Sequence, residues 1–148
     1  MDRMKCRPSS WTTPSVADRY FSPADVEALI PQLAAVMERI RDARREAMAV
    51  EERMKTEQQR ITMAGGAAFD RDRWRADQER RERLVEGMRS GLQTITRLGG
   101  VTKDVDQGLV DFPHLREGRE VNLCWKFGEK AIRFWHGLDE GYAGRKPL

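Results

Sequence analysis

Residues 108–148, GLVDFPHLREGREVNLCWKFGEKAIRFWHGLDEGYAGRKPL, decide the fold class of this 148-residue chain. Apolar and polar side chains alternate within Gly108–Phe112, Val121–Trp125 and Ile132–His136, and a period of two is typical of strands. A glycine lies in each connection between these segments, and Pro113 is expected to end the first one. The stretch therefore predicts a small antiparallel β meander, followed by a C-terminal tail that wraps around it without forming an element.

The residues before this stretch carry the period of an α-helix instead. Ser22 and Pro23 are typical of a helix start, and Pro31 predicts a bend or an early end two turns later. Two interleaved heptad tracks of apolar side chains indicate that this helix packs along another helix. The tracks are Leu33, Ile40, Ala47, Met54 and Ile61, and Leu29, Val36, Ala43 and Val50.

A second helix is predicted from about Arg71 to Leu98, between the glycines at 65–66 and those at 99–100. Two long helices joined by a short turn predict an antiparallel, coiled-coil-like hairpin. The expected fold is therefore α+β, a long helical hairpin with a small C-terminal antiparallel β meander. We expect a disordered tail over 1–20, the hairpin over 21–99 and a β-rich module over 100–148, packed as one structural domain.

Composition argues against several classes of function. Charged residues make up 34% of the chain, yet the formal net charge is only +3 because both signs are interspersed. This pattern argues against a nucleic-acid-binding surface, which needs a one-sided basic patch. There is no apolar run of membrane-spanning length and no signal-peptide core, and two cysteines make no disulfide framework. We therefore expect a cytoplasmic protein with no membrane partner.

The polar residues of the C-terminal stretch are the candidates for a site. Asp111, Cys124 and His136 are the three possible metal ligands, because carboxylate, thiolate and imidazole bind transition metals such as Zn or Fe. The alternative is that no cofactor is bound, with a buried cysteine and a histidine at a strand end. The candidate binding residues are Asp111, Cys124, Glu129, Arg133, Trp135, His136, Asp139 and Arg145.

The register of the second hairpin tests the metal hypothesis. If the second and third strands are joined by an even-numbered connection, Trp125 faces Ile132 and Val121 faces His136, which gathers the apolar side chains on one face. Cys124 and His136 then lie on opposite faces and cannot bind one metal. A connection one residue longer or shorter reverses this result.

Three further alternatives remain open from the sequence. Residues 129–139 as a helix would place Glu129, His136 and Asp139 on one face, as an acid–base or metal patch. Cys124 as a nucleophile would need a base within hydrogen-bonding reach. Asp111 is either a turn acceptor before Pro113 or a buried charge, and we expect a pair with an arginine at 119, 133 or 145.

Several segments resemble a known family. They are FSPADVEALIP at residues 21–31, GLVDFP at 108–113, VNLCWKFGE at 121–129, FWH at 134–136 and GYAGR at 141–145. They are similar to an uncharacterised bacterial family known as domain of unknown function twenty-two-oh-three, over roughly residues 20–148. The resemblance implies a small bacterial cytosolic protein and implies no reaction.

Two functions follow from this reading. The first is a cytosolic binding or assembly module, with a polar recognition site for an unknown ligand in the C-terminal module. It would self-associate as a homodimer, because Val50, Met54 and Ile61 would face water where the second helix turns polar. The second is a metal-binding protein or small metal-dependent enzyme that uses Asp111, Cys124 and His136. The sequence leaves open whether the protein is an enzyme.

Overall fold

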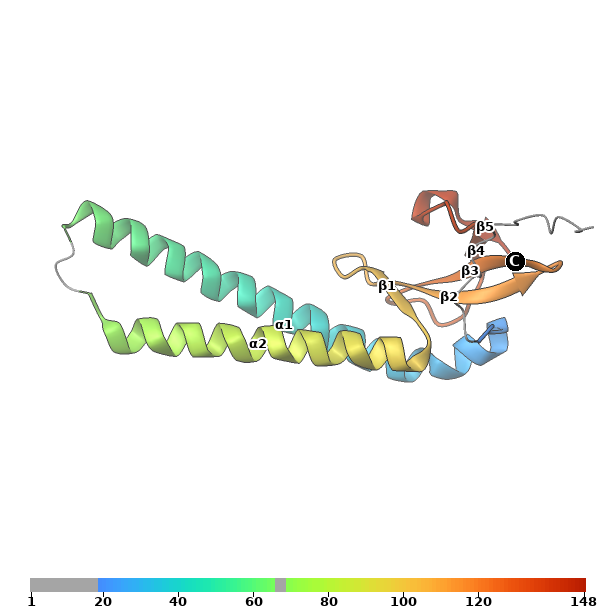
Figure 1. The fold of residues 1–148 in the computed structure, drawn as a ribbon, viewed down its shortest axis with the longest axis horizontal. Coiled ribbons are helices and arrows are strands. Elements are labelled where there is room, and N and C mark those ends of the chain that lie inside the picture. The colour runs from blue at the N-terminus through green and yellow to red at the C-terminus, as the bar shows by residue number, and fades with distance from the viewer. Residues whose placement is uncertain (1–18, 66–68) are drawn as a thin grey trace, which may run out of the picture.

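The computed structural model describes residues 19–65 and 69–148 of the chain. Helix α1 (Pro23–Met63) and helix α2 (Arg71–Leu98) form a long antiparallel hairpin, and a five-stranded sheet lies at its base (Figure 1). The α+β prediction is confirmed. The tail expected over residues 1–20 lies outside the described residues except for Arg19 and Tyr20.

Helix α1 begins with the cap that its sequence predicts. The Ser22 hydroxyl accepts from the Asp25 amide at 3.1 Å, and the Asp25 carboxylate accepts from the Ser22 amide at 2.9 Å. This capping box satisfies two amide groups at the helix end. The early end considered at Pro31 is wrong, because the helix continues through this residue to Met63. Burial of Val26, Ile30 and Leu33 on either side of this proline holds the segment helical.

Helix α2 has the predicted bounds. The Asp70 side chain caps its start, and Gly99 ends it with a φ of 99° in the left-handed region, which glycine adopts without strain. One prediction about the hairpin is wrong: Val50 and Met54 do not face water, because α2 lies along them and they are 1% and 7% exposed. The reason given for self-association therefore fails for these two residues.

The sheet contains five antiparallel strands in sequential order β1-β2-β3-β4-β5. Strands β2 (Leu109–Arg116), β3 (Arg119–Lys126) and β4 (Phe134–His136) correspond to the three predicted strands. Strand β1 (Val101–Asp104) was not predicted. The C-terminal segment, expected only to wrap, also forms a 3₁₀ turn, η1 (Tyr142–Gly144), and the short strand β5 (Lys146–Pro147).

Pro113 lies within β2 and does not end it. Its carbonyl accepts from the Phe21 amide at 2.7 Å, so this edge of the residue points away from β3. Amide and carbonyl of one strand residue point the same way, so the missing N–H of Pro113 removes no bond to β3. The hydrogen bond from Phe21 to Pro113 thus allows this proline inside the strand, although the sequence alone predicts that it ends the strand.

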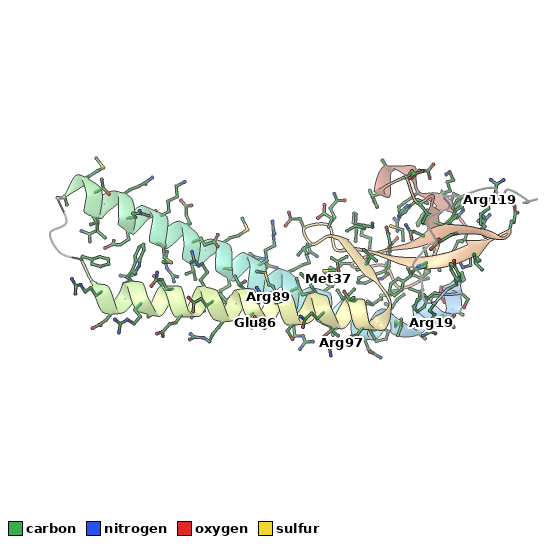
Figure 2. All side chains as sticks on the ribbon, in the orientation of Figure 1. Arg19, Met37, Glu86, Arg89, Arg97 and Arg119 are labelled. Carbon is green, nitrogen blue, oxygen red and sulfur yellow. The ribbon has the colours of Figure 1, made fainter. Side chains whose placement is uncertain are left out.

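One face of the sheet packs on the base of the hairpin. Val110 and Phe112 of β2 and Leu123 and Trp125 of β3 share a buried cluster with the apolar side chains of α1 and with Ile95 of α2. Figure 2 shows Met37, a member of this cluster, where the hairpin meets the sheet, and Glu86 and Arg89 further along α2. No helix in the described ranges is long and apolar enough to cross a membrane.

Candidate metal centre

Three adjacent strands contribute the side chains of the candidate centre. Asp111 of β2 lies opposite Cys124 of β3, and Asn122 of β3 lies opposite His136 of β4. Asn122 and Cys124 are two residues apart and therefore point to the same face of the sheet. Asp111, Cys124 and His136 thus share the face that is turned away from the helical hairpin.

The predicted separation of Cys124 and His136 is therefore wrong. The structure pairs Asn122, and not Val121, with His136, because residues 127–133 form a connection with an odd number of residues. That connection is an irregular loop fixed by tertiary contacts. The Trp125 indole donates to the Glu129 carbonyl at 3.0 Å, and the Ile132 amide donates to the Glu27 carboxylate of α1 at 3.0 Å.

These contacts explain why periodicity alone predicts the wrong parity. A strand with Ile132 opposite Trp125 is expected from the sequence because it buries both side chains. Ile132 is buried, with 5% exposed, but it reaches the core from the loop. Strand β4 begins only at Phe134, so the apolar side chains are buried without the even-numbered connection that was assumed.

The three side chains form a compact buried cluster. One ligand atom from each lies within 4.8 Å of the other two, and each residue is 2% exposed. Tetrahedral zinc with bonds of 2.0–2.3 Å places its ligand atoms roughly 3.5 Å apart. Because 4.8 Å is the upper limit of these distances and His136 Nε2 lies 3.0 Å from Asp111 Oδ1, small side-chain shifts would bring the ligand atoms to this spacing.

His136 is oriented by a backbone carbonyl. Its Nδ1 lies 2.8 Å from the Gly137 oxygen, and a carbonyl only accepts, so Nδ1 carries the hydrogen. In the neutral ring, Nε2 then presents a lone pair. Metal-binding histidines have this arrangement, in which the second nitrogen donates to an oxygen and fixes the ring.

The same nitrogen faces a carboxylate. His136 Nε2 lies 3.0 Å from Asp111 Oδ1, and both side chains are 3% exposed. Neither oxygen of Asp111 has a hydrogen-bond partner of good geometry among the described residues. Two acceptors at this distance repel unless a proton or a cation lies between them. The pair therefore requires a proton, on either the imidazole or the carboxyl group, or a bound cation.

Cys124 completes the cluster as a protonated thiol. Burial raises its pKa to about 11, and the nearby Asp111 carboxylate adds to the rise, while the Arg145 guanidinium opposes it. A thiol in this state is a poor nucleophile at neutral pH. A metal ion would have to displace the thiol proton before Cys124 could serve as a ligand.

Glu129 and Arg145 lie beside the cluster without joining it. Arg145 Nη2 donates to the Cys124 carbonyl at 3.0 Å and to Glu129 Oε1 at 2.5 Å. The expected arginine partner of Asp111 is therefore wrong: Asp111 is buried, but it faces His136, while Arg145 pairs with Glu129.

The other candidate residues lie elsewhere. Trp135 is on the helix-facing side of the sheet, opposite Leu123, and Arg133 and Asp139 are exposed. The helical alternative for residues 129–139 is wrong, because Phe134–His136 is a strand. Sequence reasoning missed the role of Gly137, whose carbonyl orients His136, and a backbone acceptor leaves no signal in sequence.

Fold and cluster together define an α+β protein whose small sheet carries a buried Asp–Cys–His constellation beneath the C-terminal segment. The chain belongs to the family described as "Uncharacterized conserved protein (DUF2203)", which it matches over residues 19–148. The family resemblance of its sequence is thus confirmed. The chain matches no curated protein and no solved structure.

Proposed function

We propose that this protein binds one divalent transition-metal ion through Asp111, Cys124 and His136. The observation that carries the proposal is the facing pair of buried acceptors, Asp111 Oδ1 and His136 Nε2, 3.0 Å apart. A cation bound by both atoms would remove their repulsion and would balance the charge of the buried Asp111 carboxylate.

Charge balance supports a divalent ion. One carboxylate, one thiolate and one neutral imidazole carry two negative charges in total, so a divalent ion would make the buried centre electrically neutral. A neutral centre avoids the large cost of leaving a net charge in a site that water does not reach. The mixed oxygen, sulfur and nitrogen donors favour zinc, with iron as the alternative ion.

The number of protein ligands bears on the kind of site. Structural zinc sites use four protein ligands, whereas catalytic zinc sites use three and leave one position for water or substrate. The three residues proposed here match the second pattern. If the fourth position of the metal holds a water molecule or a substrate that reacts, the protein is a small metal-dependent enzyme.

Metal content of the untagged protein tests the proposal. We expect about one equivalent of metal per chain after growth with zinc, and a thiolate-to-metal charge-transfer absorption after exchange for cobalt. Cys124→Ser and His136→Gln should each lose most of the metal and the absorption band. The matched controls are Cys6→Ser and Asp139→Asn, which should retain both.

The competing explanation makes a different prediction. A charged imidazolium paired with Asp111, with the Cys124 thiol packed beside them, needs no metal. A protein that takes up no zinc, iron or cobalt at neutral pH, while remaining folded, would contradict the metal proposal and favour that pair.

An assembly role through the helical hairpin is the second candidate. Figure 1 shows α1 and α2 diverging toward the tip of the hairpin, and a groove of about 490 Å³ with Trp74 in its wall lies between them. We propose that a second copy of the chain covers this groove in a homodimer. Light scattering tests it, and Trp74→Ala should shift the molecule toward the monomer, whereas Arg75→Ala on the exposed side should not.

A further inference from the structure

The C-terminal segment, Gly137–Leu148, lies on the face of the sheet that holds the cluster. Figure 1 shows this segment on the side of the sheet away from the two helices. Near its C-terminal end the segment contacts the cluster through Arg145, which donates to the carbonyl of Cys124 at 3.0 Å. The segment also follows His136 directly, and the Gly137 carbonyl orients that ring.

The segment is held mainly by polar contacts near water. Lys146 Nζ lies 4.7 Å from the centre of the Trp135 ring, the Leu148 amide donates to the Arg133 carbonyl at 2.9 Å, and β5 contributes only two residues to the sheet. Leu138 and Tyr142 remain 55% and 40% exposed. A segment with so little buried apolar surface opens at a small fraction of the free energy of global unfolding.

Arg145 is the strongest attachment of this segment. Its guanidinium pairs with Glu129 at 2.5 Å, donates to Cys124, and lies 4.3 Å from the Phe134 ring and 4.9 Å from the Tyr142 ring. The Arg145 side chain is 11% exposed, so its ion pair is screened less than the Lys146–Glu140 pair. A planar guanidinium makes these hydrogen bonds and ring contacts together, which lysine does not reproduce.

We propose that residues 137–148 form a strap over the Asp111–Cys124–His136 cluster, that Arg145 holds the strap closed, and that opening of the strap controls metal exchange. The proposal rests on the proposed metal-binding function. It explains how three ligands that are each 2% exposed would be reached by an ion. Opening of the strap is a conformational change that makes and breaks no covalent bond.

Thiol reactivity of the metal-free protein tests the opening. In a Cys6→Ser background, Cys124 is the single thiol, and a disulfide reagent reports how often it becomes accessible. Arg145→Ala should accelerate the reaction by about tenfold or more, the factor that corresponds to the loss of one charge-assisted contact. Arg133→Ala, another arginine of the same module with an exposed side chain, is the matched control and should react like the parent protein.

The sign of this effect separates exposure from acidity. Arg145 opposes the rise in the pKa of Cys124, so its removal alone would raise that pKa further and slow the reaction. An acceleration therefore points to greater access to the thiol and not to a more acidic thiol. Arg145→Lys should fall between the parent and Arg145→Ala, because it keeps the charge and loses the planar contacts.

Metal release tests the second half of the proposal. Zinc-loaded protein mixed with excess chelator should release its ion about tenfold faster in Arg145→Ala than in Arg133→Ala, in parallel with the thiol rates. An unchanged thiol rate in Arg145→Ala overturns the strap. A faster thiol rate with unchanged zinc release overturns its control of exchange. A parent protein that takes up no zinc overturns the metal function itself. The thiol rates are measured without metal, so they would still test the strap in that case.

A milder variant keeps the test available if Arg145→Ala does not fold. Lys146→Ala removes the contact of Lys146 with the Trp135 ring of β4, together with its pair with Glu140 inside the strap, and should leave the sheet intact, as circular dichroism would verify. It should accelerate both the thiol reaction and zinc release by at least about twofold. Rates equal to those of Arg133→Ala in this variant would overturn the proposal.

Discussion

At the scale of single residues, the contact between Asp111 and His136 has the largest consequence. When a buried carboxylate pairs with an arginine, replacing the carboxylate with a neutral group leaves the charge of the arginine uncompensated. A carboxylate that faces an imidazole nitrogen behaves differently, because an amide in its place can donate to that nitrogen when the ring is neutral. Because the partner of Asp111 is His136 and not an arginine, we expect a neutral substitution to be tolerated better at Asp111 than at His136.

We predict an asymmetry between two variants of the metal-free protein. His136→Leu should lower the free energy of unfolding by about 3–5 kcal/mol, because it leaves a buried carboxylate without a partner. Asp111→Asn should cost less than about 2 kcal/mol, since the Asn amide can donate to Nε2. Urea unfolding measures both, and Asp139→Asn serves as the exposed control, with an expected change within about 0.5 kcal/mol. Equal costs for the two buried variants would contradict the assigned tautomer of His136.

The sequence predicts which residues are candidate ligands, but it does not predict that their side chains lie close together. The residue types at 111, 124 and 136 identified them as candidate ligands. Whether they share a face depended on the parity of one connection, and that parity is set by a contact between the Ile132 amide and Glu27, 105 residues earlier in the chain. Local periodicity carries no information about such a contact.

At the scale of elements, the C-terminus of α2 has a backbone conformation and close packing that only a glycine fits. Gly99 has a φ of 99°, and a Cβ at this position would lie 2.3 Å from Cζ of the buried Phe21. We predict that Gly99→Ala destabilises the protein by about 2–4 kcal/mol, from left-handed strain and overpacking together. Gly87→Ala in the same helix is the control, because no atom lies within 4 Å of the added carbon. It should stabilise the protein by about 1 kcal/mol, and thermal unfolding distinguishes the two signs.

The start of α1 should respond to acid. Hydrogen bonds from the backbone and side chain of Ser22 lower the pKa of Asp25 below its ordinary value of 3.8. A carboxyl whose folded pKa is lowered stabilises the fold above its unfolded pKa, and this contribution is lost as the pH falls through the folded value. We predict that amide protection in the first turn of α1 decreases below about pH 4. Asp25→Asn should make that protection insensitive to pH in this range, and an unchanged pH response in the variant would argue against the capping box.

Helix ends could be predicted because their signals are local, whereas the sheet edges could not. Ser22, Asp70 and Gly99 satisfy or release backbone groups within a few residues of their own position. Strands β1 and β5 exist because β2 and β4 offer them hydrogen-bonding partners. Residues 101–104 and 146–147 are too short to show a period, so only the rest of the sheet specifies them.

At the scale of the whole molecule, packing is concentrated at one end. The hydrophobic core joins the base of the hairpin to the sheet, whereas beyond Met54 no residue of α1 is buried. In α2 only Ile95, near its C-terminal end, is buried. The tip of the hairpin therefore depends on helix propensity and on partly exposed ion pairs such as Arg53–Asp77, whose individual contributions are small.

This gradient predicts the order in which the molecule exchanges its amide hydrogens. Residues 55–63 and 71–84 should exchange faster than β2 and β3 in the isolated chain, since local opening follows the density of buried contacts. If two copies pair across the groove beside Trp74, protection of the tip should rise with protein concentration, while that of β2 and β3 stays constant. Hydrogen exchange by mass spectrometry at several concentrations, with light scattering on the same samples, measures both effects. A monomer at every concentration, with a tip that exchanges quickly throughout, would confirm the gradient and reject the dimer. A tip protected as strongly as the sheet in a monomer would contradict the gradient itself.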